Sequence, residues 1–119
     1  MKNESDLIAL HIDFDKYTDG DNDFKRELIS LIAVDIMELH RCIVSAFKMN
    51  DAELLRKGCH KAGTTLEMIN DPKLTTLING LKEKMANSNT NQRAVSEEEV
   101  LPLYKFFNVL AKSIAHLNE

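Results

Sequence analysis

The stretch DFKRELISLIAVDIMELHRCIVSAFKM, residues 23–49, decides the fold of this chain. Apolar residues recur in it every three or four positions, which keeps one face of a single long helix apolar. That face is formed by Leu28, Leu31, Ile32, Leu39, Ile43, Ala46 and Phe47. The acidic run DGDND, residues 19–23, supplies an N-cap and suits the positive end of the helix dipole. Partner helices are needed to cover so long an apolar face.

The sequence after residue 49 predicts three further amphipathic helices. Each begins at a capping signal. These signals are the Asn50–Glu53 pair, the Asp71–Pro72 dipeptide and the Ser96–Glu99 capping box. The first of the three helices is expected to continue to about Asn70, and the polar, aperiodic segment 87–95 is expected to be a loop.

This order of elements predicts an all-α protein with the architecture of an up-and-down four-helix bundle. We expect one domain over residues 1–119, with the bundle at about 23–119. Residues 1–22 are expected to form a short N-terminal helix or a lid over one end of the bundle.

Composition argues against several classes of function. The 119 residues carry a formal net charge of −4, which argues against a general affinity for nucleic acids or anionic membranes. No apolar run approaches the roughly 20 residues that span a bilayer, and the N-terminus lacks a signal-peptide pattern. The two cysteines do not make a disulfide framework. We therefore expect a cytoplasmic protein with reduced cysteines.

His60 lies in the middle of the second amphipathic segment. On a helical wheel the other apolar residues of that segment fall within roughly 40° of Leu55, whereas His60 falls roughly 140° away from it. The apolar set is Leu55, Cys59, Ala62, Leu66 and Ile69. The wheel therefore predicts that Cys59 points into the core and that His60 is displayed to solvent.

The neighbours of this histidine suit an anionic group. Arg56 and Lys57 lie one turn before it, and Lys61 is adjacent to it. These cations could neutralise a phosphoryl group, and the hydroxyl of Thr64 could donate a hydrogen bond to it. Gly63, expected mid-helix, would leave space for a bulky group to approach the imidazole. The alternative interpretation is that His60 is an ordinary solvated surface histidine without a function.

Two segments resemble the histidine-containing phosphotransfer (HPt) domain family of multistep two-component phosphorelays. DGDNDFKRELISLIAVDIMELH, residues 19–40, is similar to the long first bundle helix of the family. MNDAELLRKGCHKAG, residues 49–63, is similar to the turn and helix that carry the family's active histidine. The likeness covers most of the chain. It implies a four-helix bundle with an exposed histidine midway along one helix.

The resemblance implies that His60 is the phosphoacceptor of a phosphocarrier that is not itself an enzyme. Such a protein relays a phosphoryl group between receiver-domain aspartates, so the implied partners are response-regulator receiver domains and a hybrid histidine kinase. Mg²⁺ would belong to the receiver, and no cofactor is expected on this chain. No G-x-x-x-x-G-K-[ST] motif for ATP is present. We expect a monomer.

The motif departs from the family pattern at one position. The usual core is His-x-x-Lys-Gly, and here Gly63 stands where the phosphate-neutralising lysine normally lies. Candidate substitutes are Lys61, Arg56, Lys57 and, on the next helix, Lys82. The alternative function is a degenerate HPt-like bundle that binds a receiver or kinase without being phosphorylated. A weaker alternative is an unrelated helical interaction module.

A receiver would also need apolar surface beside the histidine. Met68 lies off the predicted buried stripe of its helix, and Met37 is expected to lie off that of the first long helix, so both are candidates for receiver docking. The set His40, Cys42, Cys59 and His60 offers the side chains of a zinc site. The spacing of these residues matches no standard zinc pattern, and we expect no metal site.

Overall fold

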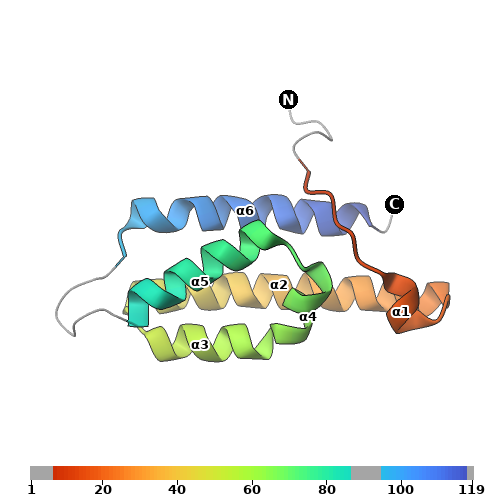
Figure 1. Ribbon diagram of the computed structural model, residues 1–119, viewed down its shortest axis with the longest axis horizontal. Helices are drawn as coiled ribbons and strands as arrows, with labels where there is room; N and C mark the ends of the chain where they lie inside the picture. The colour runs from red at the N-terminus through yellow and green to blue at the C-terminus, as the bar shows by residue number, and fades with distance from the viewer. Residues whose placement is uncertain (1–6, 87–94, 118–119) are drawn as a thin grey trace.

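The computed structural model describes residues 7–86 and 95–117, and within these ranges it is all-helical with no strand (Figure 1). The all-α prediction is therefore confirmed. The six helices of the described ranges are α1 (Phe14–Thr18), α2 (Asn22–Met49), α3 (Ala52–Lys61), α4 (Gly63–Ile69), α5 (Pro72–Ala86) and α6 (Glu97–His116). None of them offers the length of apolar sequence that a bilayer crossing requires.

Helix α2 begins and ends where the sequence indicates. The side chain of Asp21 accepts hydrogen bonds from the backbone N–H groups of Asp23 and Phe24, at 2.9 and 3.1 Å. The helix ends at Met49, and the C-cap residue Asn50 adopts the left-handed conformation with φ 50°. One predicted core residue is wrong, because Leu31 is 57% exposed. The core face is instead completed by residues such as Ile36, which is buried.

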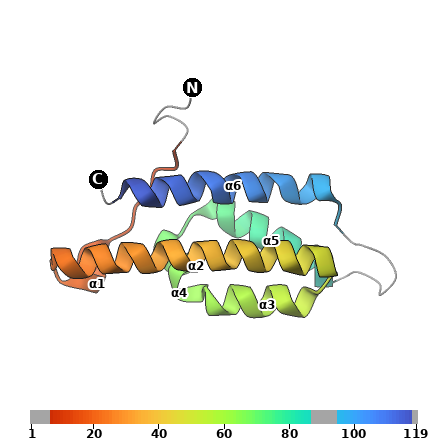
Figure 2. The ribbon, with the colours of Figure 1, turned by 180° about the vertical axis from the view of Figure 1, so that it is seen from behind.

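Helices α2, α3, α5 and α6 supply most of the buried core. Helix α2 contacts α3 and α6, and α5 contacts the same two helices from the other side. The two opposite views show α6 and α3 flanking α2, with α5 on the front face of Figure 1 (Figures 1 and 2). The most deeply buried side chains come from α2, α3, α5 and α6, and include Ile32, Ile43, Leu55, Leu74, Phe107 and Leu110.

The segment predicted as one helix up to Asn70 is broken in two. Helix α3 ends at Lys61, and Ala62, with φ −88° and ψ 6°, separates it from α4. The helix also starts one residue later than the predicted cap, because Asp51 and not Asn50 accepts the capping hydrogen bond, from Leu54 N–H at 3.0 Å. Gly63 is therefore the first residue of a short helix and does not lie mid-helix.

The later helix starts agree with the predicted signals in position. Asp71 accepts a hydrogen bond from Leu74 N–H at 3.0 Å and so caps α5. Ser96 is the N-cap of α6 but makes no capping hydrogen bond with its side chain. Its hydroxyl donates instead to Glu99, which also accepts a hydrogen bond from Lys84 at 2.6 Å.

The N-terminal segment agrees in part with the expected helix or lid. Its described portion holds the five-residue helix α1, which contacts α2. The backbone N–H of Ile8 donates to Ser113 Oγ at 2.8 Å, which ties this segment to α6. The predicted loop at 87–95 lies outside the described residues except for Val95, which is buried.

Candidate functional site

His60 occupies the last turn of α3 and is exposed, whereas the preceding Cys59 is only 7% exposed. The orientation that the helical wheel predicts for both residues is therefore observed. It arises because α3 buries the face of Leu55 and Cys59 against the core. Burial also raises the pKa of the Cys59 thiol, which makes it a poor competitor to the imidazole as a nucleophile.

A groove of about 430 Å³ lies beside His60, between the α3–α4 segment and α5. Arg56, His60 and Gly63 line it from one side. Asn79 and Lys82 line it from α5. The groove is open to solvent and mixes polar with apolar walls, so a charged group could approach the imidazole from outside.

Two of the predicted cations belong to this groove. Lys82 is half-buried on α5, and its positive charge lies close enough to Cys59 to act against the rise in the pKa of that thiol. Arg56 lies one turn before His60 and is exposed. Its guanidinium donates to the carboxylate of Glu53, with Nε at 2.9 Å, and this hydrogen bonding lowers the pKa of Glu53. An incoming anion would therefore compete with Glu53 for Arg56.

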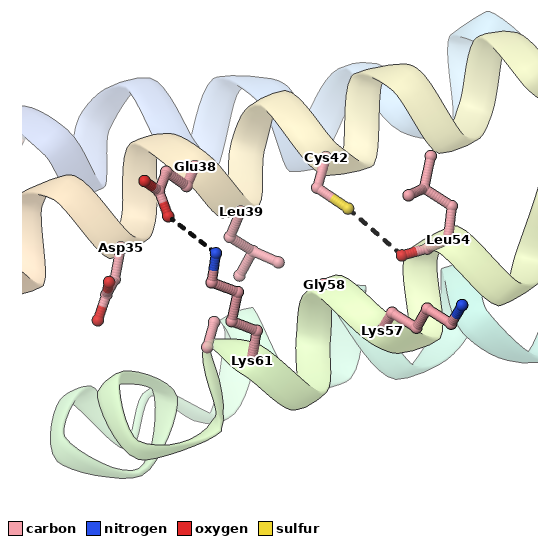
Figure 3. Close-up of a pocket in the computed structure, with 9 residues that line it drawn as sticks. Asp35, Glu38, Leu39, Cys42, Leu54, Lys57, Gly58 and Lys61 are labelled. Atoms are coloured by element: carbon pink, nitrogen blue, oxygen red, sulfur yellow. Dashed lines mark hydrogen bonds and ion pairs between the residues drawn. The ribbon is translucent and has the colours of Figure 1, made fainter.

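The other two predicted cations face a different side of α3. Lys57 and Lys61 line a second hollow, of about 270 Å³, between α3 and α2 (Figure 3). Nζ of Lys61 lies 3.8 Å from a carboxylate oxygen of Glu38 on α2. Adjacency in sequence does not bring Lys61 toward the histidine groove, because successive residues of a helix point about 100° apart. Thr64 is exposed on α4 and is not among the residues that line the histidine groove.

Beside the second hollow, α3 packs closely on α2, and this contact fixes the rotation of α3. A Cβ atom on Gly58 would collide with the Sγ atom of Cys42. That thiol donates a hydrogen bond to the backbone oxygen of Leu54 at 3.4 Å. The face of α3 that carries Gly58 and Leu54 therefore lies against α2, and the face that carries His60 is turned toward the groove with α5.

The structure corrects the predicted docking methionines. Met68 is 9% exposed and packs in the core, so its side chain is not available to a partner. The break at Ala62 changes the buried face of the segment, and α4 buries Thr65, Met68 and Ile69. Met37 is 47% exposed, but it lies on α2, which does not line the histidine groove.

Sequence reasoning missed the polar residues that α5 contributes to the groove. Thr75 and Asn79 line it together with Lys82, at spacings of four and three residues along one face of α5. This repeat is visible in the sequence. Which face of α5 meets α3, however, depends on helix packing that the repeat does not specify.

The described residues, 7–86 and 95–117, contain no group of three or more histidine, cysteine or acidic side chains arranged to hold a metal ion. Comparison with protein-family models found no matching family, and searches of curated proteins and of solved structures found no significant match.

Proposed function

We propose that this chain is a histidine phosphotransfer protein in which His60 accepts a phosphoryl group from a receiver-domain aspartate and passes it to another receiver. The observation that carries the proposal is the exposed position of His60 on a groove that also holds Arg56 and Lys82. The resemblance of residues 19–40 and 49–63 to the HPt family supports it independently.

The fold that we propose for this function is an up-and-down four-helix bundle. Its helices would be α2, the α3–α4 segment, α5 and α6, and the contacts of α2 and of α5 with both α3 and α6 support this arrangement. The protein would act as a cytoplasmic monomer with receiver domains and a hybrid histidine kinase as partners, and without nucleic acid or membrane.

In the proposed transfer, a ring nitrogen of His60 attacks the phosphorus of the receiver's aspartyl phosphate. The P–O bond to the aspartate breaks, its electron pair returns to the carboxylate, and an N–P bond forms. The imidazole suits this step because its unprotonated nitrogen is a nucleophile near neutral pH. Mg²⁺ would be supplied by the receiver. On this chain Lys82 and Arg56 would offset the charge of the transferred group.

A second candidate function is supported by the residues that replace the family motif. Gly63 lines the groove without a cation, Lys61 is turned toward Glu38, and Arg56 is engaged by Glu53. If Lys82 alone does not neutralise enough of the charge of a phosphoryl group, the protein would be a degenerate HPt-like module. Such a module would bind a receiver or kinase without being phosphorylated.

Chemical phosphorylation separates the two candidates. Phosphoramidate donates its phosphoryl group to histidine: its P–N bond breaks with release of ammonia, and a new N–P bond forms on the imidazole. We expect one acid-labile, base-stable phosphoryl group per chain, lost in His60→Gln. His11→Gln is the matched control, because His11 is also exposed and lies outside the groove.

Transfer from receiver domains that have been charged with a small phosphodonor completes the test. Label on the wild-type protein and on His11→Gln, with none on His60→Gln, supports the relay. Absence of label with every receiver, together with retained receiver binding, supports the degenerate module. Absence of both label and binding contradicts both functions.

A further inference from the structure

Helix α2 holds the chain on both sides of the break that follows His60. Glu38 pairs with Lys61, the last residue of α3, and Asp35, one turn earlier on α2, accepts a hydrogen bond from Thr65 on α4. Figure 3 shows Asp35 and Glu38 extending from α2 toward the end of α3. The break at Ala62 lies between these two attachments.

The two attachments differ strongly in strength. Thr65 Oγ1 donates to Asp35 Oδ2 at 2.6 Å, and Thr65 is only 2% exposed. A short hydrogen bond to a carboxylate with a buried donor is among the stronger polar contacts in proteins. Lys61 and Glu38, in contrast, are 3.8 Å apart with side chains that are 82% and 51% exposed, and pairs of this kind contribute little. The Asp35–Thr65 hydrogen bond therefore dominates.

Helix α4 is held in place by its contacts with the rest of the fold, which are the burial of Met68 and Ile69 and the Asp35–Thr65 hydrogen bond. It has seven residues, too few for a helix to be stable in water by itself, and no side chain caps its N-terminus. Its first residue, Gly63, and residues one turn further on, Leu66 and Glu67, line the groove beside His60. The position of α4 therefore sets the shape of that groove.

We propose that Asp35 and Thr65 are positioning residues for His60: their hydrogen bond fixes α4 after the helix break and so holds open the groove through which the phosphoryl group reaches the imidazole. This inference rests on the phosphotransfer function proposed above. Neither residue lines the groove beside His60, and Asp35 lines the hollow on the opposite side of α3.

The test compares variants by two measurements on the full chain. Thr65→Val removes the donor and keeps the shape of the side chain, and Thr65→Ser restores the donor. Glu38→Gln is the matched control that removes a neighbouring carboxylate charge from the same face of α2. The measurements are amide hydrogen exchange across α4 and the initial rate of His60 phosphorylation by phosphoramidate.

In Thr65→Val we expect exchange across α4 to accelerate about tenfold, as for the loss of one hydrogen bond to a charged group. We expect the phosphorylation rate to fall several-fold, while α6 exchanges as in the wild type. Thr65→Ser and Glu38→Gln should match the wild type in both measurements. Asp35→Asn keeps an uncharged acceptor, so it should accelerate exchange across α4 and lower the phosphorylation rate by smaller factors. This variant replaces Thr65→Val in the test if Thr65→Val does not fold.

A wild-type phosphorylation rate in Thr65→Val or, where that variant is unfolded, in Asp35→Asn overturns the inference and leaves the proposed function standing. An equal loss of rate in Glu38→Gln also overturns it, because charge and not position would then be the cause. If the wild type itself is not phosphorylated at His60, the proposed function fails, and this inference fails with it.

Discussion

Replacing Lys82 by alanine tests which cation serves His60. Lys82 is half-buried on α5 and lines the groove beside the histidine, whereas Lys61 is the immediate neighbour of His60 in sequence but lines the hollow on the other side of α3. Each substitution removes one positive charge and one long side chain, so Lys61→Ala is a matched control for Lys82→Ala.

The magnitude follows from Coulomb's law for a charge at contact distance and from the exposure of the two side chains. A unit charge about 4 Å from the phosphoryl group contributes ~1 kcal/mol in water and ~4 kcal/mol at an effective dielectric constant near 20. The groove is open and Lys82 is half-buried, so we take a value near the lower end, ~1.4 kcal/mol, which is about a tenfold change in rate. The side chain of Lys61 is 82% exposed and paired with Glu38, so its loss should change the rate by less than about twofold.

The assay is the initial rate of phosphohistidine formation with phosphoramidate, followed by phosphorus NMR, with circular dichroism to confirm that each variant is folded. We expect the rate to fall about tenfold in Lys82→Ala and to stay near the wild-type value in Lys61→Ala. The opposite order, with the larger loss in Lys61→Ala, would refute the assignment of the groove to His60 and Lys82.

Three further predictions concern stability. Gly58→Ala places a methyl group against Cys42 Sγ and should destabilise the fold by about 1–3 kcal/mol in urea unfolding, whereas Gly80→Ala, with open space at its Cβ position, should be neutral or stabilising by up to ~1 kcal/mol. Burial lowers the pKa of His40 from 6.5, so the folded state favours the neutral imidazole. The contribution of His40 to the free energy of unfolding is therefore fully present above pH 6.5 and is lost as the pH falls through the folded-state pKa. The difference in urea midpoint between the wild type and His40→Gln should narrow on acidification. The hydroxyl of Tyr104 is buried without a hydrogen-bond partner, so Tyr104→Phe should raise the thermal midpoint or leave it unchanged, and a clear fall would show that the hydroxyl is satisfied in solution.

The sequence was sufficient to predict the long helix α2 because its boundaries depend on local chemistry. Asp21 caps the start, and Asn50 adopts the left-handed conformation that ends the helix. The exposure of His60 and the burial of Cys59 were also predictable, since both residues precede the break and a regular helical wheel applies to them.

The helix breaks at Ala62, and beyond the break the wheel is right for Ile69, which is buried as predicted, but wrong for Met68. No proline marks this break, and the Asp35–Thr65 hydrogen bond that holds α4 to α2 joins residues thirty positions apart. The wheel extended through the break left Met68 outside the core, where the structure buries it. Lys57 and Lys61 face away from the groove because the close contact of α3 with α2 sets the rotation of α3. This contact between separate helices, like the Asp35–Thr65 hydrogen bond, is not visible in the local sequence.

The hydrogen bond between Ile8 and Ser113 brings the first and last described parts of the chain together. The path of the backbone is therefore nearly a closed loop, and Figure 1 shows the N-terminal segment passing beside the C-terminal end of α6. An engineered connection could join the segment at Ile8 to the end of α6, and the chain could then be opened elsewhere, as circular permutation does in other proteins. Opening the chain between α3 and α4 would release the segment after His60 while every other helix kept its covalent neighbours.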